Sequence, residues 1–141
     1  MTGKFVAAVV AALVASAAPV HAGGDVWVDA KGADHSVFVD DYGRGNATAV
    51  VTTGRGNLHD VVTTGRANTQ IQRAWGTGNS IISTTQGVRN SVEIDVDADW
   101  NHVTVDTQGA GNYTIVEQTR RGSAAWVSSD GVRQNIIVNQ R

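Results

Sequence analysis

Four aspartates are the residues of this chain that come closest to a metal-binding set. Asp95, Asp97 and Asp99 alternate with other residues, and Asp106 stands at the twelfth position counted from Asp95. Carboxylates at positions 1, 3 and 5 with an acid at position 12 match the spacing of an EF-hand calcium loop. The sixth position of that loop needs glycine for its sharp turn, and here it is Trp100. Simple alternation of polar and apolar residues explains the same spacing, so no calcium site is expected.

Other residues that carry chemistry are scarce. The histidines beyond the N-terminal segment are His35, His59 and His102, and they do not share one phase of the repeat described below, so no metal site is predicted. The chain has no cysteine, which excludes disulfides, thiolate ligands and a thiol nucleophile. It contains neither a Gly-x-Ser-x-Gly elbow nor a P-loop. We therefore expect no enzyme and no cofactor.

Composition narrows the function classes further. The 141 residues carry a formal net charge of −2, and 17% of them are charged. This balance argues against a protein that binds nucleic acid through a basic surface. The apolar content of 41% is too high for a disordered chain, and most of it is valine and alanine. A single folded domain that does not bind nucleic acid is expected.

The N-terminus has the pattern of a secretory signal peptide. Lys4 precedes an apolar run over residues 5–18, Pro19 ends the run, and small residues stand at positions 20 and 22. Residues 1–22 are therefore expected to form a helical signal peptide that is cleaved after Ala22. The alternative is a membrane anchor, but a run of about fourteen residues is shorter than the roughly 20 that span a bilayer. A secreted mature chain without a membrane span is the prediction.

An eleven-residue repeat runs through the remainder of the chain. One phase of the repeat is asparagine: Asn46, Asn57, Asn68, Asn79, Asn90, Asn101 and Asn112. The phase three residues earlier is glycine: Gly32, Gly43, Gly54, Gly65, Gly76, Gly87, Gly109 and Gly131. The phase four residues after asparagine is mostly aliphatic: Val28, Val39, Val50, Val61, Ile94, Val105, Val116, Val127 and Val138, with Gln72 and Ser83 in between. Three positions that keep one period over most of the chain indicate a repeat architecture.

The repeat is predicted to be a strand followed by a tight turn. An eleven-residue period also suits a right-handed helical supercoil, but a glycine in every unit costs about 1 kcal/mol in a helix interior. Apolar and polar residues instead alternate within units such as 90–96 and 101–106, which is typical of strands with one buried face. Glycine-rich segments at 43–45, 54–56, 76–78 and 109–111 supply the turns.

Two repeats, or 22 residues, are expected to make one coil of a two-sheet, all-β solenoid with cross-β geometry. Identical inward patterns in each unit favour stacking over a meander, and about five coils about 4.8 Å apart would result. The expected organisation is residues 1–22 as signal peptide, 23–42 as an N-terminal segment with the first half-coils, and 43–141 as the repeat solenoid. The Val and Ile series would face inward.

Two roles are open for the asparagines. At a spacing of about 4.8 Å, each inward side-chain amide can pass a hydrogen bond to the asparagine one coil away, forming a ladder. Alternatively, the asparagines simply accept left-handed turn conformations. In both cases their role is architectural.

The coil from Gly54 to Trp75 departs most from the apolar pattern. His59, Gln70 and Gln72 occupy positions that are apolar in other units. The sequence does not say whether this coil keeps regular geometry.

The segments 111–118 and 134–140 resemble the curlin repeat of secreted bacterial amyloid subunits. In that family, Asn or Ser precedes an alternating strand that closes on Gln six residues later, and the 22-residue units stack as a solenoid. Gln118 and Gln140 match the closing position, which other units fill with threonine: Thr52, Thr63, Thr85 and Thr107. The resemblance covers the chain from about Gly24 to Arg141.

The resemblance implies a subunit that self-assembles into extracellular, curli-like amyloid fibres for biofilm matrix and surface adhesion. Its implied partners are other copies of itself, a companion curlin subunit and a dedicated outer-membrane secretion channel reached through the periplasm. The bare strand-like ends, 26–28 and 136–138, favour self-assembly because open sheet edges template another copy. One alternative is the minor nucleator subunit of the same fibre.

Two further alternatives remain open. A monomeric β-solenoid that binds ice or a glycan is suggested by the threonine pairs 52–53, 63–64 and 84–85. A surface adhesin that forms no amyloid would share the same export signal.

Overall fold

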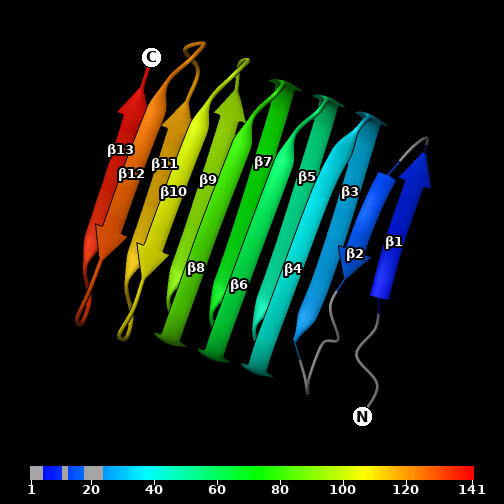
Figure 1. Cartoon of the computed structure of the whole chain (residues 1–141). Coiled ribbons are helices and arrows are strands. Elements are labelled where there is room, and N and C mark those ends of the chain that lie inside the picture. Colours follow the sequence, from blue (N-terminus) through cyan, green and yellow to red (C-terminus); the bar gives the residue numbers. More distant parts are fainter. Residues whose placement is uncertain (1–4, 11–12, 18–23) are drawn as a thin grey trace.

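In a computed structural model, which describes residues 5–10, 13–17 and 24–141, the chain is built from parallel strands alone (Figure 1). The strands are β1 (Phe5–Val10), β2 (Leu13–Ala17), β3 (Asp25–Ala33), β4 (His35–Arg44), β5 (Ala47–Arg55), β6 (Leu58–Arg66), β7 (Thr69–Thr77), β8 (Ser80–Val88), β9 (Ser91–Asp97), β10 (His102–Thr107), β11 (Tyr113–Gln118), β12 (Ala124–Ser129) and β13 (Asn135–Gln140). The described ranges hold no helix, and hence none that is long and apolar enough to cross a bilayer.

Consecutive strands alternate between two sheets. The odd-numbered strands form a seven-stranded sheet and the even-numbered strands a six-stranded sheet. From β3 onward, each strand pairs in parallel with the strand 22 residues further on, so that Val50, Gln72 and Ile94 lie in one row. One coil therefore consists of two strands and two turns, and the predicted two-sheet β-solenoid of about five coils is confirmed. β1 and β13 lie at opposite ends of the stack (Figure 1).

Alternation of side chains explains why these segments are strands. In β9, burial alternates at every residue, with Val92, Ile94 and Val96 inside. β-Branched residues fit such a pleated, half-buried surface. The coil from Gly54 to Trp75 keeps this alternation and the 22-residue register, so it is regular in spite of its polar residues.

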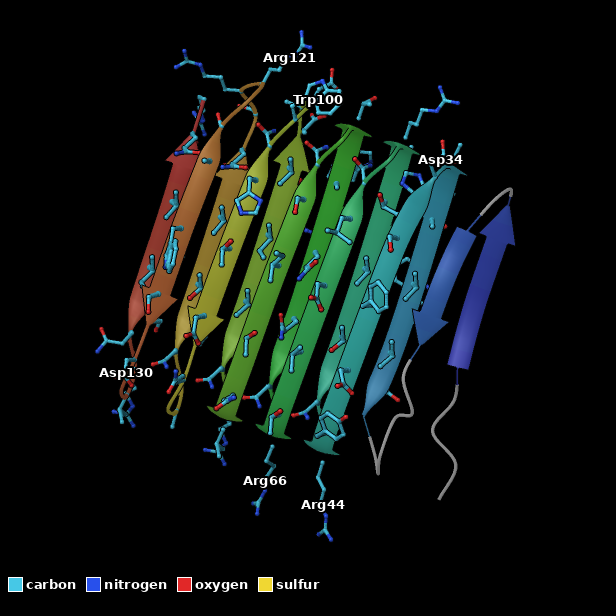
Figure 2. All side chains as sticks on the ribbon, in the orientation of Figure 1. Asp34, Arg44, Arg66, Trp100, Arg121 and Asp130 are labelled. Atoms are coloured by element: carbon cyan, nitrogen blue, oxygen red, sulfur yellow. The ribbon has the colours of Figure 1, made fainter. Side chains whose placement is uncertain are left out.

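Most turns depend on two left-handed backbone positions, although the first of them is absent where the residue is Ala98 or Arg120. At the first, a glycine such as Gly87 has a φ of 112°, and a Cβ there would overlap the carbonyl oxygen of Gly109 in the next coil. At the second, directly before the asparagine, the chain uses either glycine or another residue, for example Ala67 with a φ of 55°. Side chains at the turns extend beyond the sheets, as Arg44 and Arg66 do at one edge in Figure 2.

The N-terminal segment differs from the expectation of a helix. β1 and β2 continue the two sheets and pair in parallel with β3 and β4. The predicted cleavage position after Ala22 lies outside the described residues.

The interior contains two apolar clusters. One is formed by buried residues of β3 to β6, namely Val26, Val37, Val39, Val50 and Val61. The other is larger and extends from β7 to β12: Ala74, Ile81, Val92, Ile94, Val96, Val103, Val105, Val116, Ala125 and Val127. Between them lies a layer of buried polar side chains that is described with the site.

Candidate functional site: the polar ladder and the end strands

Each asparagine of the repeat is almost fully buried and bonds to the coil that follows it. The side-chain Oδ1 of Asn46 accepts a hydrogen bond of 3.1 Å from the backbone N–H of Asn68, and Oδ1 of Asn68 accepts one of 3.0 Å from Asn90. The same contact recurs on the other side of the solenoid, for example from the N–H of Asn79 to Oδ1 of Asn57 at 3.0 Å. These bonds connect successive coils at both turns.

The amide nitrogens of Asn57, Asn68, Asn90 and Asn112 each bond to two turn carbonyls. Nδ2 of Asn68 donates to the carbonyl oxygen of Thr64 at 3.0 Å and to that of Gly87, in the next coil, at 3.1 Å. Asn57 does the same with Thr53 and Gly76. These asparagines thus pair backbone groups that a tight turn would otherwise leave buried without partners. Among the described residues, Nδ2 of Asn101 does not, since it has no hydrogen-bond partner.

The geometry differs from both roles considered for the asparagines. The residue before each asparagine, not the asparagine itself, has positive φ, as Ala67, Arg89 and Trp100 show. The ladder also does not run from amide to amide, because its rungs join side-chain atoms to backbone atoms. The backbone N–H of each asparagine points toward Oδ1 of the asparagine one coil earlier. This hydrogen bond fixes the distance between the two coils.

Several positions of the same phase are not asparagine and still join the ladder. Nδ1 of His35 accepts a long hydrogen bond of 3.4 Å from the backbone N–H of Asn57. At the C-terminal side, the N–H groups of Ser123 and Gln134 donate to Oδ1 of Asn101 and Asn112 at 2.7 and 3.0 Å. The sequence signal that identifies His35, Ser123 and Gln134 as members of the ladder is their place in the asparagine phase of the eleven-residue period.

The aliphatic series faces the interior. Val50, Val61, Ile94, Val105, Val116 and Val127 are buried, whereas Val138 on the last strand is partly buried against the larger cluster. Because like residues stand one above another, each coil covers the apolar surface of its neighbours.

The closing positions of the repeat also face inward. Thr52, Thr63, Thr85, Thr107 and Gln118 are fully buried. Nε2 of Gln118 donates to Oε1 of Gln140 at 2.6 Å, which extends a side-chain ladder into the last strand. Because the first threonine of the pairs 52–53 and 63–64 and the second of 84–85 point inside, each pair presents at most one hydroxyl to solvent, and no flat outward Thr-x-Thr array results.

A polar layer separates the two apolar clusters. His59 and Gln72 are fully buried, and Nδ1 of His59 lies 3.0 Å from Oε1 of Gln72. Beside them, Nε2 of Gln70 donates to the carbonyl oxygen of Val62 at 2.8 Å, and the hydroxyl of Ser83 bonds to Oε1 of Gln70. Among the described atoms, Nε2 of His59 and Nε2 of Gln72 have no hydrogen-bond partner.

Burial dominates the protonation of His59. Desolvation lowers the pKa of its imidazole from 6.5 to about 4, although the hydrogen bond with Gln72 favours the charged form. The histidine is therefore neutral near pH 7 and stays a dipolar member of the core layer.

The aspartates of the calcium-like spacing do not converge. Asp99 accepts a hydrogen bond of 2.7 Å from the backbone N–H of Thr77 and so belongs to a turn. Partial burial raises the pKa of Asp95, an effect that the guanidinium of Arg73 opposes. Over the residues whose positions are described, no group of three or more His, Asp or Glu side chains is arranged to hold a metal ion.

Large apolar side chains are exposed on β12 and β13 at one end of the solenoid, and on β3 and β4, which pair with β1 and β2 near the other end. Trp27 on β3 and Phe38 on β4 are 44% and 47% exposed, and Trp126 on β12 and Ile137 on β13 are 83% and 64% exposed. Trp126 and Ile137 lie on the strands whose outer edges carry no further strand within the described chain.

These features define a two-sheet parallel β-solenoid with a side-chain-to-backbone ladder at both turns. No family model, curated protein or solved structure matches this chain.

Proposed function

We propose that this protein is a secreted structural subunit that self-assembles end to end into extracellular, curli-like amyloid fibres. Such fibres would serve biofilm matrix and surface adhesion. We further propose two partners, a companion curlin subunit and an outer-membrane secretion channel. The resemblance of the repeat to curlin sequences is what supports these two partners.

The observation that carries the proposal is the open edge at the end of the solenoid. β13 pairs with β11 on one side and β12 pairs with β10, and within the described chain neither has a strand on its outer side. An edge without proline, bulge or covering helix exposes a row of unpaired N–H and C=O groups. Solenoids that remain monomeric protect such an edge with a cap.

The ladder supports assembly by the same physics that stacks the coils. The N–H of Gln134 already uses Oδ1 of Asn112, and a further coil would use the side chain of Gln134 in turn. Addition of a copy therefore forms backbone, ladder and apolar contacts of the kinds found inside the chain, at an end that offers all three.

The test is fibre formation by the processed chain, residues 23–141, which contains both apolar clusters and all of the side-chain ladder described above. We expect unbranched fibres by electron microscopy and X-ray reflections near 4.8 Å and about 10 Å. A chain that stays monomeric at millimolar concentration contradicts the proposal.

A pair of variants ties the result to the end strand. Val138→Lys introduces a charge at an inward position of β13 and is expected to slow elongation at least tenfold. Thr104→Lys introduces the same charge on an outward face of β10, in the middle of the solenoid, and is expected to elongate normally. Equal elongation rates of the two variants would show that the β13 edge is not used.

A further inference from the structure

The first and last strands of the solenoid lie in the same sheet. β3 to β13 are eleven strands, and both β3 and β13 belong to the seven-stranded sheet. β1 also belongs to that sheet, so the statement holds with or without the N-terminal segment. The odd-numbered sheet thus exceeds the even-numbered sheet by one strand.

This excess strand decides how two copies can stack. If a second copy followed in the same orientation, its β3 would pair with β13, and its β4 would face β12 across the width of one missing strand. The backbone groups of both strands would then lack partners inside the junction, which is costly. A continuous junction requires the second copy to be turned by half a revolution about the long axis of the solenoid.

The half-turn restores every strand pair. It moves β3 of the second copy beside β12, and β4 beside β13. The strands of the two sheets run in opposite directions, as the arrowheads in Figure 1 show, and the half-turn reverses direction and exchanges sheets together. The new pairs are therefore parallel, like all pairs inside the chain.

The interior of the junction matches when the eleven-residue phase is kept. Val127 on β12 then stands next to Val28 on β3, and Val138 on β13 next to Val39 on β4. Val28 and Val138 are only partly buried in a single copy. Stacking would complete their burial, because Val28 would pack beside the buried Val127 and Val138 beside the buried Val39.

The exterior matches as well. The same phase places Trp126 beside Trp27 and Ile137 beside Phe38, four side chains that are 83%, 44%, 64% and 47% exposed. Inner strands carry smaller or better covered residues at this position: Ala49, Asp60, Ile71, Ile82, Glu93, Thr104 and Ile115. In the region from β3 to β13, the large exposed residues of this phase lie only on the two strands at each end. Trp126 beside Trp27 would form an aromatic pair, which stabilises a contact beyond the apolar area that it buries.

A buried carboxylate faces the same junction. Asp41 on β4 is 1% exposed and accepts a hydrogen bond of 2.7 Å from Nδ2 of Asn46. Gln140 on β13 has the same phase in the repeat, and its Oε1 is already used by Gln118. Its amide nitrogen donates to the carbonyl oxygen of Ala124 at 2.9 Å in a single copy. In the half-turn junction the second N–H of this amide would be adjacent to the Asp41 carboxylate, a donor next to an acceptor.

We propose that copies of the processed chain, residues 23–141, in which β3 and β4 are no longer paired with β1 and β2, join through β12–β3 and β13–β4 pairs, so that successive subunits are related by a rotation of about 180° and a rise of five and a half coils. This inference rests on the proposed function and adds the partner surface and its symmetry. At about 4.8 Å per coil the rise is about 26 Å.

Single cysteines test the junction directly, because the chain has none of its own. Ser128 on β12 and Asp29 on β3 both point outward and are neighbours in the half-turn junction. Paired strands lie about 4.8 Å apart, within the Cα range of a disulfide. We expect fibres grown from an equal mixture of the Ser128→Cys and Asp29→Cys processed chains to give a covalent dimer on mild oxidation. Fibres of either variant alone should give none.

A second mixture separates the two orientations. Asn139 on β13 would neighbour Asp29 if copies stacked without rotation, but with the half-turn the two lie on opposite outer faces, more than about 10 Å apart. The Asn139→Cys and Asp29→Cys mixture should therefore give no dimer, and Asn139→Cys with Asp40→Cys should give one. A dimer from Asn139→Cys with Asp29→Cys, or from one variant alone, overturns the inference while leaving fibre formation intact.

The two proposals fail in different ways. Absence of fibres from the unsubstituted processed chain contradicts the proposed function, and the junction falls with it. Fibres whose helical symmetry by electron cryo-microscopy shows no rotation near 180° per subunit contradict the junction alone.

Discussion

The side-chain Oδ1 of Asn46 accepts a hydrogen bond of 3.1 Å from the backbone N–H of Asn68, the residue that stands 22 positions later in the chain. A side chain that reaches the backbone of the next coil couples the spacing of the coils to the sequence period. Any shift of register by one residue would move Oδ1 away from this N–H and turn the inward face outward. The asparagine phase therefore specifies the stacking register.

Asn68→Ala is expected to destabilise the solenoid by about 2–3 kcal/mol. The substitution removes one acceptor and two donors, and so leaves the N–H of Asn90 and the carbonyls of Thr64 and Gly87 without those partners. The urea midpoint for loss of β-sheet circular dichroism measures the effect. Thr69→Ala, on the outward face next to it, is the control and should change stability by less than about 0.5 kcal/mol. Equal effects of the two substitutions would show that the ladder contributes nothing specific.

Gly87→Ala is expected to prevent regular stacking. Its φ of 112° is unfavourable for alanine, and a Cβ would overlap the carbonyl oxygen of Gly109. Gly56→Ala is the matched control, since its φ is 63° and a Cβ there meets nothing within 4 Å. Ala67 occupies the corresponding position of the next half-coil with a φ of 55°. Gly56→Ala should cost about 1 kcal/mol, and the β-sheet signal should persist in this variant and be lost in Gly87→Ala. Retention of normal stability by Gly87→Ala would contradict the close approach.

The period of the sequence was sufficient to predict the fold class. A glycine, an asparagine and an aliphatic residue that recur in most units of eleven fix the turn, the buried polar position and the apolar face, and these three determine a two-strand coil. Atomic roles could not be predicted, because a period places Asn46 over Asn68 without saying which atom of each is in contact.

Departures from the repeat were harder to interpret. His35 stands in the asparagine phase but is another residue type, and its ladder bond depends on the ring orientation in the structure. The hydrogen bonds of the polar layer around His59 could not be predicted, because the sequence does not say which side chains meet across the two sheets.

The polar layer can be replaced by apolar residues if both sides of it change. In their rows, His59 stands between Val37 and Ile81, and Gln72 between Val50 and Ile94. His59→Val alone leaves Oε1 of Gln72 buried without its partner and is expected to cost about 1–3 kcal/mol.

The double variant His59→Val with Gln72→Val removes both members of the pair and joins the two apolar clusters. We expect it to be at least as stable as the parent chain, since two nitrogens without hydrogen-bond partners disappear. The urea midpoints of the two variants provide the comparison. A double variant less stable than the single one would show that the layer is needed to hold the two sheets together.

Acid should destabilise the parent chain through His59. Because burial lowers the pKa of this imidazole from 6.5 in the unfolded chain to about 4 in the folded chain, the unfolded state binds the extra proton between these two values. The stability that results from keeping the buried imidazole neutral is fully present above pH 6.5 and is lost as the pH falls toward 4. A difference of this size corresponds to about 3 kcal/mol. The urea midpoint of the parent should therefore fall between pH 7 and pH 4.

The double variant without His59 and Gln72 separates this effect from other acid-sensitive groups. Burial raises the pKa of Asp41, so this carboxyl binds a proton more readily in the folded chain and its titration acts in the opposite direction. Both chains keep Asp41, and their difference isolates the histidine. We expect the stability difference between the two chains to grow by about 3 kcal/mol from pH 7 to pH 4. If the stability difference between the two chains stayed constant over that range, burial would not lower the pKa of His59. The polar layer would then be open to water at acid pH.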